Sequence, residues 1–209
     1  MAEYPTPGGN LMFDVMHIIS ALDKAKEPAY EKRLRRVVPS SQHVHAVRRP
    51  AIREITESWL EGHADVAESE ITGLAEALWS TGWREERLVA LNLIASDVGV
   101  VSSLDFDFLR RLALDVDNWE LIDQIGRIGG RLLQMRPRLL PRVEAFAASD
   151  NPLVRRLGVT TLVEGADDLT WQGALVAMVD RLKDDPDEQV RRAVGRARRF
   201  LRQRGAKVG

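Results

Sequence analysis

The residues whose side chains are best suited to carry out chemistry are Trp119 and Asp123, near the middle of the 209-residue chain. On a helix, residues four positions apart emerge from the same face, one turn apart. An indole face beside a carboxylate suits a cationic ligand, or a group that becomes cationic as it reacts. If the helix faces a groove, this pair predicts a site. If it faces the core, Trp119 is packing and Asp123 makes a local cap or ion pair.

Basic side chains are concentrated at the C-terminal end, although the net charge is only −1. No acidic residue follows Glu188, whereas eight basic residues do: Arg191, Arg192, Arg196, Arg198, Arg199, Arg202, Arg204 and Lys207. Taking these eight from the total of 30 leaves 22 basic against 31 acidic residues in positions 1–188, a balance of −9. A basic end on an acidic body predicts contact with a polyanion, and the alternative is a solvated final helix with a charged tail.

The composition predicts a globular protein and excludes several kinds of site. Hydrophobic residues make up 44% of the chain and charged residues 29%, which is ordinary for a folded soluble protein. Cysteine is absent, which excludes disulfides, thiolate nucleophiles and Cys-type zinc sites. The apolar run 11–22 contains Asp14 and His17, so neither a signal peptide nor a membrane span is expected. These features together predict a cytoplasmic protein.

Helices are expected to position the candidate residues, because apolar residues recur at three- and four-residue spacing and no run alternates like a strand. Eleven helices are predicted, over 11–26, 29–38, 50–61, 69–79, 84–94, 104–114, 119–133, 138–147, 151–164, 171–183 and 187–204. The sequence therefore predicts an all-α fold. We expect a flexible N-terminus over 1–10, a single helical-repeat domain over 11–204 and a flexible tail over 205–209.

A weak internal repeat indicates stacked helix pairs. Segments 85–90, 154–159 and 190–195 align with one another, with an offset of roughly 35 residues once the helix of Trp119 is counted between the first two. This pattern predicts a HEAT-like superhelix, an α-solenoid in which equivalent helices line one concave basic groove. Arg87, Asp123, Arg156 and Arg192 would then occupy similar phases, which places Asp123 among arginines on a single surface.

Four stretches resemble motifs of the AlkD-type alkylpurine DNA glycosylases, the HEAT-like DNA alkylation repair proteins. Residues 43–50 are similar to a GV-x-x-P entry to a helix, with Ala46 where glycine is common. Residues 77–91 resemble a W…EER…AL helix pair, and residues 119–123 resemble W-D-x-V-D. Residues 148–156 resemble S-x-N-x-W-x-x-R. The four stretches occur in the family's order, and the likeness extends from about residue 42 to residue 202.

The resemblance implies a function and a set of roles. Members of that family hydrolyse the N-glycosidic bond of positively charged N3- or N7-alkylated purines in duplex DNA, without a metal or other cofactor. Their central tryptophan and aspartate lie at the lesion, which gives these catalytic roles to Trp119 and Asp123. A carboxylate there stabilises the oxocarbenium-like sugar as the cationic base leaves. A later arginine that contacts the DNA backbone corresponds to Arg156.

The chain departs from the family pattern at two positions. Arg196 stands where the C-terminal helix often carries a second tryptophan facing the lesion, and Leu153 stands where an aromatic residue is frequent. An arginine can still stack on a base or bind a phosphate. The full set of predicted DNA-binding residues is therefore Arg87, Arg155, Arg156, Arg192 and Arg196.

Other sequence features have plainer interpretations. His43 and His45 have no third ligand at metal-binding spacing, so no metal site is predicted. Gly126, Gly129 and Gly130 are expected to serve close helix packing or a kink, because no strand precedes them as it would in a phosphate-binding loop.

We therefore predict a monomeric, nucleoid-associated DNA glycosylase that acts on alkylated purines in base excision repair and needs no cofactor. Its partner is duplex DNA, and no membrane contact is expected. Two alternatives stay open. One is a non-catalytic family member that recognises unusual DNA structures. The other is a HEAT scaffold for a protein partner, for which the balance of −9 over positions 1–188 is the best argument.

Overall fold

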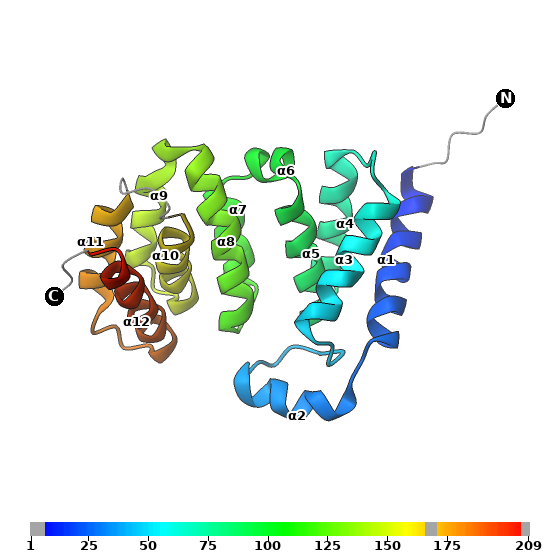
Figure 1. The fold of residues 1–209 in the computed structure, drawn as a ribbon, viewed down its shortest axis with the longest axis horizontal. Coiled ribbons are helices and arrows are strands. Elements are labelled where there is room, and N and C mark those ends of the chain that lie inside the picture. Colours follow the sequence, from blue (N-terminus) through cyan, green and yellow to red (C-terminus); the bar gives the residue numbers. More distant parts are fainter. Residues whose placement is uncertain (1–6, 166–170, 206–209) are drawn as a thin grey trace. The chain divides into compact units, whose positions relative to one another are not determined.

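The computed structural model describes residues 7–165 and 171–205, and within these ranges the chain is built from helices without any strand (Figure 1). The α-helices are α1 (Pro7–Lys24), α2 (Pro28–Val37), α3 (Arg49–Gly62), α4 (Glu68–Ser80), α5 (Arg84–Ser96), α6 (Val98–Ser103), α7 (Phe106–Leu114), α8 (Trp119–Met135), α9 (Leu140–Ala145), α10 (Pro152–Gly165), α11 (Gln172–Leu182) and α12 (Glu188–Gln203). The prediction of an all-α fold is confirmed.

The structure differs from the predicted helices at two places. Helix α6 has only six residues and includes Gly99, so it shows no helical periodicity in the sequence. The predicted helix 138–147 is broken into the short helix α9 with a 3-10 turn on either side, Pro137–Leu139 and Phe146–Ala148. Pro137 and Pro141 each lie in a first turn, of the 3-10 helix and of α9, where proline is favoured, so each marks the start of a separate short element.

The chain divides into two compact units, residues 1–100 and 101–209. The single domain predicted over 11–204, with flexible ends, stays a prediction, and residues 1–6 and 206–209 lie outside the described residues. In the first unit, α4 packs against α5 and α1, while α3 packs against α5 and α1. Buried side chains from these helices form its core, among them Ile18, Leu22, Ile52, Leu78 and Leu91.

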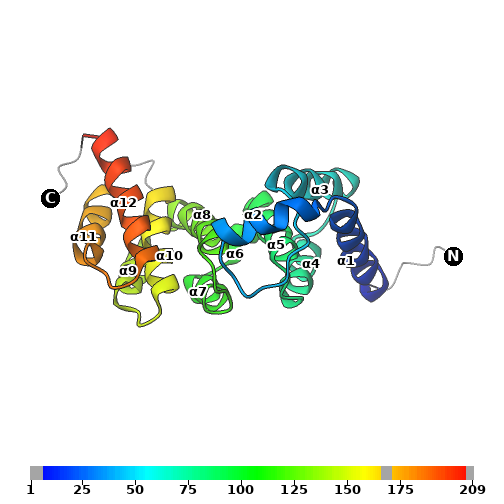
Figure 2. The same cartoon turned by 90° about the horizontal axis from the view of Figure 1, so that it is seen from below.

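Helix α10 is the centre of the second unit. It packs between α8 and α12, as two views show (Figure 1 and Figure 2), and it also contacts α7 and α11. Its side chains are buried on several faces, from Val154 through Leu157 and Val159 to Leu162. A helix that is apolar on most sides is expected to lie inside a structure.

The N-caps of α8, α10 and α12 have a common form and a regular spacing. The side chain of Asn118 accepts hydrogen bonds from the backbone of Glu120 and Leu121. Asn151 and Asp187 cap α10 and α12 in the same way, through the amides two and three residues later. The caps are 33 and 36 residues apart (118 to 151, then 151 to 187), close to the predicted offset of about 35.

Glycines bring α8 and α10 into close contact, as the sequence predicted for Gly126, Gly129 and Gly130. A Cβ atom on Gly126 would lie 2.5 Å from Thr160 Cγ2, and one on Gly129 would lie 2.7 Å from Thr161 Oγ1. A Cβ on Gly130 would lie 2.7 Å from the backbone nitrogen of Gly165. These contacts advance in step along both helices, so α8 and α10 run in the same direction.

Replacing Gly130 by alanine should therefore destabilise the second unit. The new methyl group would meet the backbone of α10, which cannot give way as a flexible side chain does, and we expect a loss of about 1–3 kcal/mol in the free energy of unfolding. Gly195→Ala in α12 is the matched control, because the nearest atom to its Cβ would be Arg199 Nη1 at 3.9 Å. That control should gain about 0.5–1 kcal/mol. Urea denaturation of the two variants measures both effects, and equal stabilities would contradict the close packing.

Candidate functional site

Trp119 and Asp123 lie on one face of α8 near its N-terminus, as their spacing predicted. Capping by Asn118 fixes the start of the helix at Trp119. The indole of Trp119 is half-buried, whereas the Asp123 side chain keeps only about a tenth of its surface exposed. The pair is therefore at the edge of the core, with the indole the more accessible of the two.

The Asp123 carboxylate is held by groups from two other helices. From α10, Arg156 donates through Nε to Oδ1 at 3.0 Å and through Nη2 to Oδ2 at 2.9 Å, a bidentate ion pair. From α12, Arg196 donates through Nη1 to Oδ2 at 2.9 Å. The hydroxyl of Thr160 lies 3.3 Å from Oδ1 and completes the set. Both carboxylate oxygens are therefore engaged.

These contacts keep Asp123 ionised. Burial alone would raise the pKa of its carboxyl group, because it disfavours the charged form. The hydrogen bonds from Arg156 and Arg196 outweigh burial, and the pKa of Asp123 lies below its usual value. The site thus contains one negative charge between two positive ones, with a net charge of about +1.

The indole of Trp119 already has a cation beside it. The Arg156 guanidinium carbon lies 5.7 Å from the centroid of the Trp119 ring, within the range of a cation–π contact. Arg156 also donates through Nη1 to the carbonyl oxygen of Gln189 at 2.5 Å, so its guanidinium is held on three sides. Arg156 is therefore a fixed part of the site and is only 4% exposed.

Arg196 is held less tightly than Arg156. Its side chain is 39% exposed, and only Nη1 contacts Asp123. Its Nη2 atom is buried and has no hydrogen-bond partner within the described residues. A buried donor without an acceptor is unfavourable by roughly 1–3 kcal/mol. The present position of the Arg196 guanidinium is therefore not its most favourable one, and a movement that gave Nη2 an acceptor would be stabilised.

The other predicted DNA-binding arginines lie elsewhere. Arg155 forms a bidentate pair with Asp185, at 2.7 and 2.8 Å, and donates to the carbonyl oxygens of Ser149 and Asp150. Arg192 is exposed and pairs with Glu188 on its own helix at 2.6 Å. The predicted repeat phase places Arg192 on the same surface as Asp123. In the structure, Arg196, one helical turn after Arg192, contacts Asp123 instead.

Arg87 belongs to the first unit and is buried there. Its guanidinium carbon lies 4.7 Å from the centroid of the Trp79 ring, and Nε donates to the Trp79 carbonyl oxygen at 3.1 Å. These contacts give Arg87 a packing role. A DNA-binding role for Arg87, like those for Arg155 and Arg192, stays a prediction.

Comparison with known proteins identifies the family. A sequence model of the family described as "DNA alkylation repair enzyme" matches residues 18–207, which is most of the chain. The chain belongs to the DNA alkylation repair enzyme family. Among curated proteins, no sequence matches the chain.

A solved structure shares the fold of this family member. It is described as a predicted DNA alkylation repair enzyme from Enterococcus faecalis, and it aligns with a TM-score of 0.67 at 15% sequence identity. The alignment covers 86% of this chain and 85% of that one. Identity at this level shows a common fold, and it does not extend to the roles of individual residues.

His45, in the first of the four motif-like stretches, has a structural role that the sequence did not reveal. His45 Nε2 lies 2.7 Å from Glu86 Oε1, and its Nδ1 lies 3.2 Å from Asp23 Oδ1. Burial alone would lower the pKa of His45, but the hydrogen bonds to Glu86 and Asp23 outweigh it, and the pKa of His45 is raised. Its imidazole stacks on Trp83 with ring centroids 4.4 Å apart.

The loop around His45 holds Ala46 in an unusual backbone conformation. Glu85 accepts from the backbone nitrogens of His45 and Val47, at 2.9 and 3.2 Å, and so fixes the loop. Between them, Ala46 has a φ of 62°, in the left-handed region where glycine is at ease and a side chain costs about 1–2 kcal/mol. Glycine would adopt this backbone conformation without that cost.

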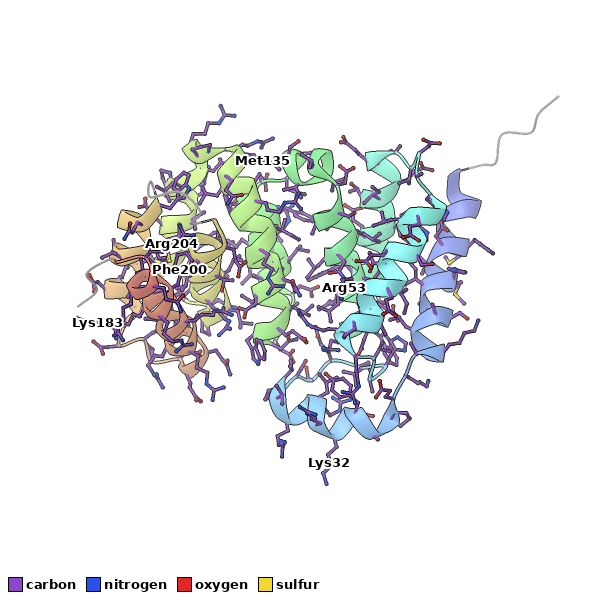
Figure 3. All side chains as sticks on the ribbon, viewed as in Figure 1. Lys32, Arg53, Met135, Lys183, Phe200 and Arg204 are labelled. Carbon is purple, nitrogen blue, oxygen red and sulfur yellow. The ribbon has the colours of Figure 1, made fainter. Side chains whose placement is uncertain are left out.

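Sequence analysis also missed a cationic helix in the first unit. Helix α2 exposes Lys32, Arg33 and Arg36, and Lys32 extends away from the fold (Figure 3). The run EKRLRR carries this signal, with one buried leucine, Leu34, among the charges.

Two searches of the described residues bear on other kinds of site. No group of three or more histidine, aspartate or glutamate side chains in the described chain is placed to hold a metal ion. In the same ranges, no helix combines the length and apolar character needed to cross a membrane.

The lowered pKa of Asp123 predicts how this family member loses stability in acid. The folded pKa lies below the unfolded value of about 3.9, so the stabilisation by Asp123 is complete above that value and is lost as the pH falls through the folded pKa. The difference in unfolding free energy between the wild type and Asp123→Asn should be constant above about pH 5 and should shrink below about pH 4. Denaturation at a series of pH values measures it, with Glu144→Gln as an exposed control. A difference that grows in acid would contradict the ion pair.

Proposed function

We propose that the protein is a DNA glycosylase that excises positively charged N3- or N7-alkylated purines from duplex DNA. The observation that carries this proposal is the ionised Asp123 beside the accessible indole of Trp119, with cations from two further helices around it. Membership of the DNA alkylation repair enzyme family supports it. Trp119 and Asp123 are the proposed catalytic residues, and no cofactor is required by the chemistry below.

The chemistry suits a carboxylate that stays charged. An alkylated purine is already cationic, so its bond to C1′ breaks with the electron pair leaving on the base nitrogen. Positive charge then develops on the sugar, and Asp123 stabilises it electrostatically. A water molecule adds to C1′ and loses a proton, which leaves a hydroxyl at C1′ and a neutral free base. Neutral lesions lack the ready leaving group and should be poor substrates.

In the free protein, two arginines already more than compensate the charge of Asp123. A DNA phosphate would compete for the more exposed of them, Arg196, whose guanidinium would turn outward and bring its unpartnered Nη2 to the phosphate. Drawing Arg196 toward a phosphate leaves Asp123 with Arg156 alone, and so increases the negative field at the sugar. Binding of the backbone and activation of the carboxylate are coupled in this scheme.

Further phosphate contacts are proposed from the exposed cations of α2 and α12. The exposed residues are Lys32, Arg33 and Arg36 on α2, and Arg191, Arg192 and Arg199 on α12. Phosphate contacts set the register of a duplex, and they dominate the salt dependence of affinity. A concave basic groove formed by a HEAT-like solenoid, and action as a monomer, belong to the same proposal.

A second candidate function is recognition of DNA without catalysis. The observation that favours it is Arg196, which replaces the family's second tryptophan and holds the catalytic carboxylate in an ion pair. If phosphates do not displace Arg196, Asp123 stays neutralised and the site binds DNA without excising a base. The activity of substituted proteins separates the two candidates.

Asp123→Asn should abolish most excision and leave DNA binding intact or slightly tighter, because a negative charge near phosphates is removed. Loss of a preorganised charge is expected to slow excision by roughly 100-fold, or about 3 kcal/mol of barrier. Trp119→Ala should have a smaller effect, since a cation–π contact contributes about 1–2 kcal/mol. Single-turnover release of bases from duplexes containing N7-methylguanine, followed by chromatography, measures both.

Glu144→Gln is the control for that experiment, because Glu144 is an exposed carboxylate of the same unit. It should excise at the wild-type rate. Wild-type rates for Asp123→Asn would show that the carboxylate is structural and would remove the mechanism. A wild type that binds DNA but excises no base would favour the second candidate.

The affinity for duplex DNA should fall steeply with salt, and Arg196→Ala should reduce that slope by about one unit of log affinity per log salt. This variant removes one phosphate contact for all sequences alike. Arg110→Ala is the matched control, since Arg110 is an exposed arginine on α7 that does not contact Asp123. Fluorescence anisotropy at several salt concentrations measures the slopes. An unchanged slope for Arg196→Ala would exclude a phosphate contact at this residue.

A further inference from the structure

Helix α2 contributes little apolar surface to the core of the first unit. Leu34 is the one buried residue of this helix. Figure 1 shows α2 at the edge of the unit, between the turn that follows α1 and the loop 38–48 that leads into α3. A short helix with so little buried surface is only marginally stable by itself. The position of α2 therefore depends on the segments that flank it.

The loop 38–48 is joined both to the start of α2 and to α5. The backbone nitrogen of Glu27, just before α2, donates to the carbonyl oxygen of Ala46 at 3.1 Å. Arg48 donates through Nε to the Glu27 carboxylate at 2.7 Å. On the α5 side, Glu85 accepts from two backbone nitrogens of the loop. Anything that holds this loop in place therefore also holds α2.

The side chain of His45 connects the loop to two helices. Its Nε2 lies 2.7 Å from Glu86 Oε1 on α5, and its Nδ1 lies 3.2 Å from Asp23 Oδ1 on α1. An ionised carboxylate can only accept, so both contacts form only if both ring nitrogens carry a proton, as they do in the imidazolium. The raised pKa of His45 agrees with this geometry, because burial, which lowers it, is outweighed by the hydrogen bonds to Glu86 and Asp23.

The two carboxylates differ in their access to water. The Glu86 side chain is 3% exposed, and its Oε2 is buried without a hydrogen-bond partner within the described residues. The Asp23 side chain is 49% exposed. A neutral imidazole has one N–H, which should stay with Glu86, because a buried carboxylate is strongly disfavoured without a partner. Nδ1 would then present a lone pair to Asp23, and Asp23 can turn to water instead.

Other charged groups near His45 do not replace the imidazolium. The charged and titratable side chains around it are Asp23, Lys26, His43, Arg84, Glu85 and Glu86. Lys26 pairs with Asp23 at 3.0 Å, and Arg84 pairs with Glu85 at 2.8 Å. His43 and His45 both pack on the indole of Trp83, with ring centroids 5.1 and 4.4 Å away. The proton on His45 is therefore the group that links α1 to α5.

We propose that His45 is a proton-dependent clamp that holds loop 38–48, and with it α2, against α1 and α5. In the imidazolium form, His45 joins Asp23 to Glu86. When His45 loses a proton at alkaline pH, the contact with Asp23 breaks, and the segment 25–48 opens locally. The cations of α2 then lose their fixed positions, which under the proposed function would weaken phosphate binding. The clamp itself does not require that function.

The direction of the pH dependence follows from the raised pKa of His45. The folded pKa lies above the unfolded value of about 6.5, so the stabilisation by His45 is complete below that value. It is lost as the pH rises through the folded pKa. The clamp should therefore be closed at neutral pH and should open in alkali.

Nuclear magnetic resonance of the histidine ring nitrogens in the full chain tests the first part of the proposal. The resonances of His45 are assigned by their loss in His45→Gln. At about pH 7, where an ordinary histidine is mostly neutral, both ring nitrogens of His45 should be protonated. A neutral His45 ring at this pH, or a titration midpoint at or below about 6.5, would overturn the clamp.

Hydrogen exchange tests the opening of the segment. The protection factors of amides in 28–48, each referred to an unstructured peptide at the same pH, should fall about tenfold or more once the pH is a unit or more above the midpoint of His45. Amides of α10, in the second unit, should keep their protection over the same range. Protection in 28–48 that does not depend on pH would also overturn the proposal.

Two variants at exposed positions separate the clamp from a local charge effect. Asp23→Asn keeps the shape of the side chain but removes its charge, so the midpoint of His45 should fall by about one unit. Protection in 28–48 should then be low and should change little with pH. Lys26→Gln is the matched control, because it removes the other partner of Asp23 and leaves the carboxylate, and it should keep both wild-type responses.

A folded Asp23→Asn protein with the wild-type midpoint and the wild-type pH dependence of exchange would show that Asp23 and His45 are not coupled, and would refute the clamp. Circular dichroism confirms that each variant is folded. Because neither readout involves DNA, failure of the clamp and failure of the proposed glycosylase activity are distinguishable.

Discussion

The close approach of α8 and α10 is the constraint on which the candidate site depends. Gly126, Gly129 and Gly130 bring no side chain from α8 to this interface, so α10 comes near enough for Asp123 to bind two nitrogens of one guanidinium from α10. A wider spacing would need longer side chains to make the same contact, and would admit water to the pair. The packing of small residues therefore also determines the electrostatics of the carboxylate. The same helix, α8, places Trp119 at the edge of this ion-pair cluster.

The Asp123 carboxylate is already paired with two cations before any ligand arrives, which distinguishes it from a carboxylate that simply points into a groove. Arg156 is buried and triply held, whereas Arg196 is partly exposed and has a nitrogen to spare. The two arginines therefore have different roles. Arg156 fixes the carboxylate and its ionisation, whereas under the proposed function Arg196 exchanges partners with a DNA phosphate. A tryptophan in place of Arg196 would leave Asp123 with a single cation from the outset.

Local sequence signals predicted much of this structure. The helix that pairs Trp119 with Asp123 and the packing role of the glycines both depend on residues close in sequence. The partners of Asp123 could not be predicted in this way, because Arg196 lies 73 residues away and the repeat phase favoured Arg192. The pairing of His45 with Glu86 and the left-handed Ala46 likewise depend on tertiary contacts. Periodicity identifies the face of a helix, but not which neighbour that face meets.

Arg155 and Arg156 are adjacent in α10, yet they bind carboxylates on different elements. Arg155 binds Asp185 in the turn before α12, and Arg156 binds Asp123 on α8. Successive helical residues point about 100° apart, so each arginine has one partner that the other cannot reach. If α10 slipped by one residue, Arg155 would rotate toward Asp123, and Asp185 would lose its guanidinium inside the fold. An unpaired buried charge is disfavoured by roughly 3–5 kcal/mol. The two ion pairs therefore fix the register of α10, because its apolar surface alone would tolerate several alignments.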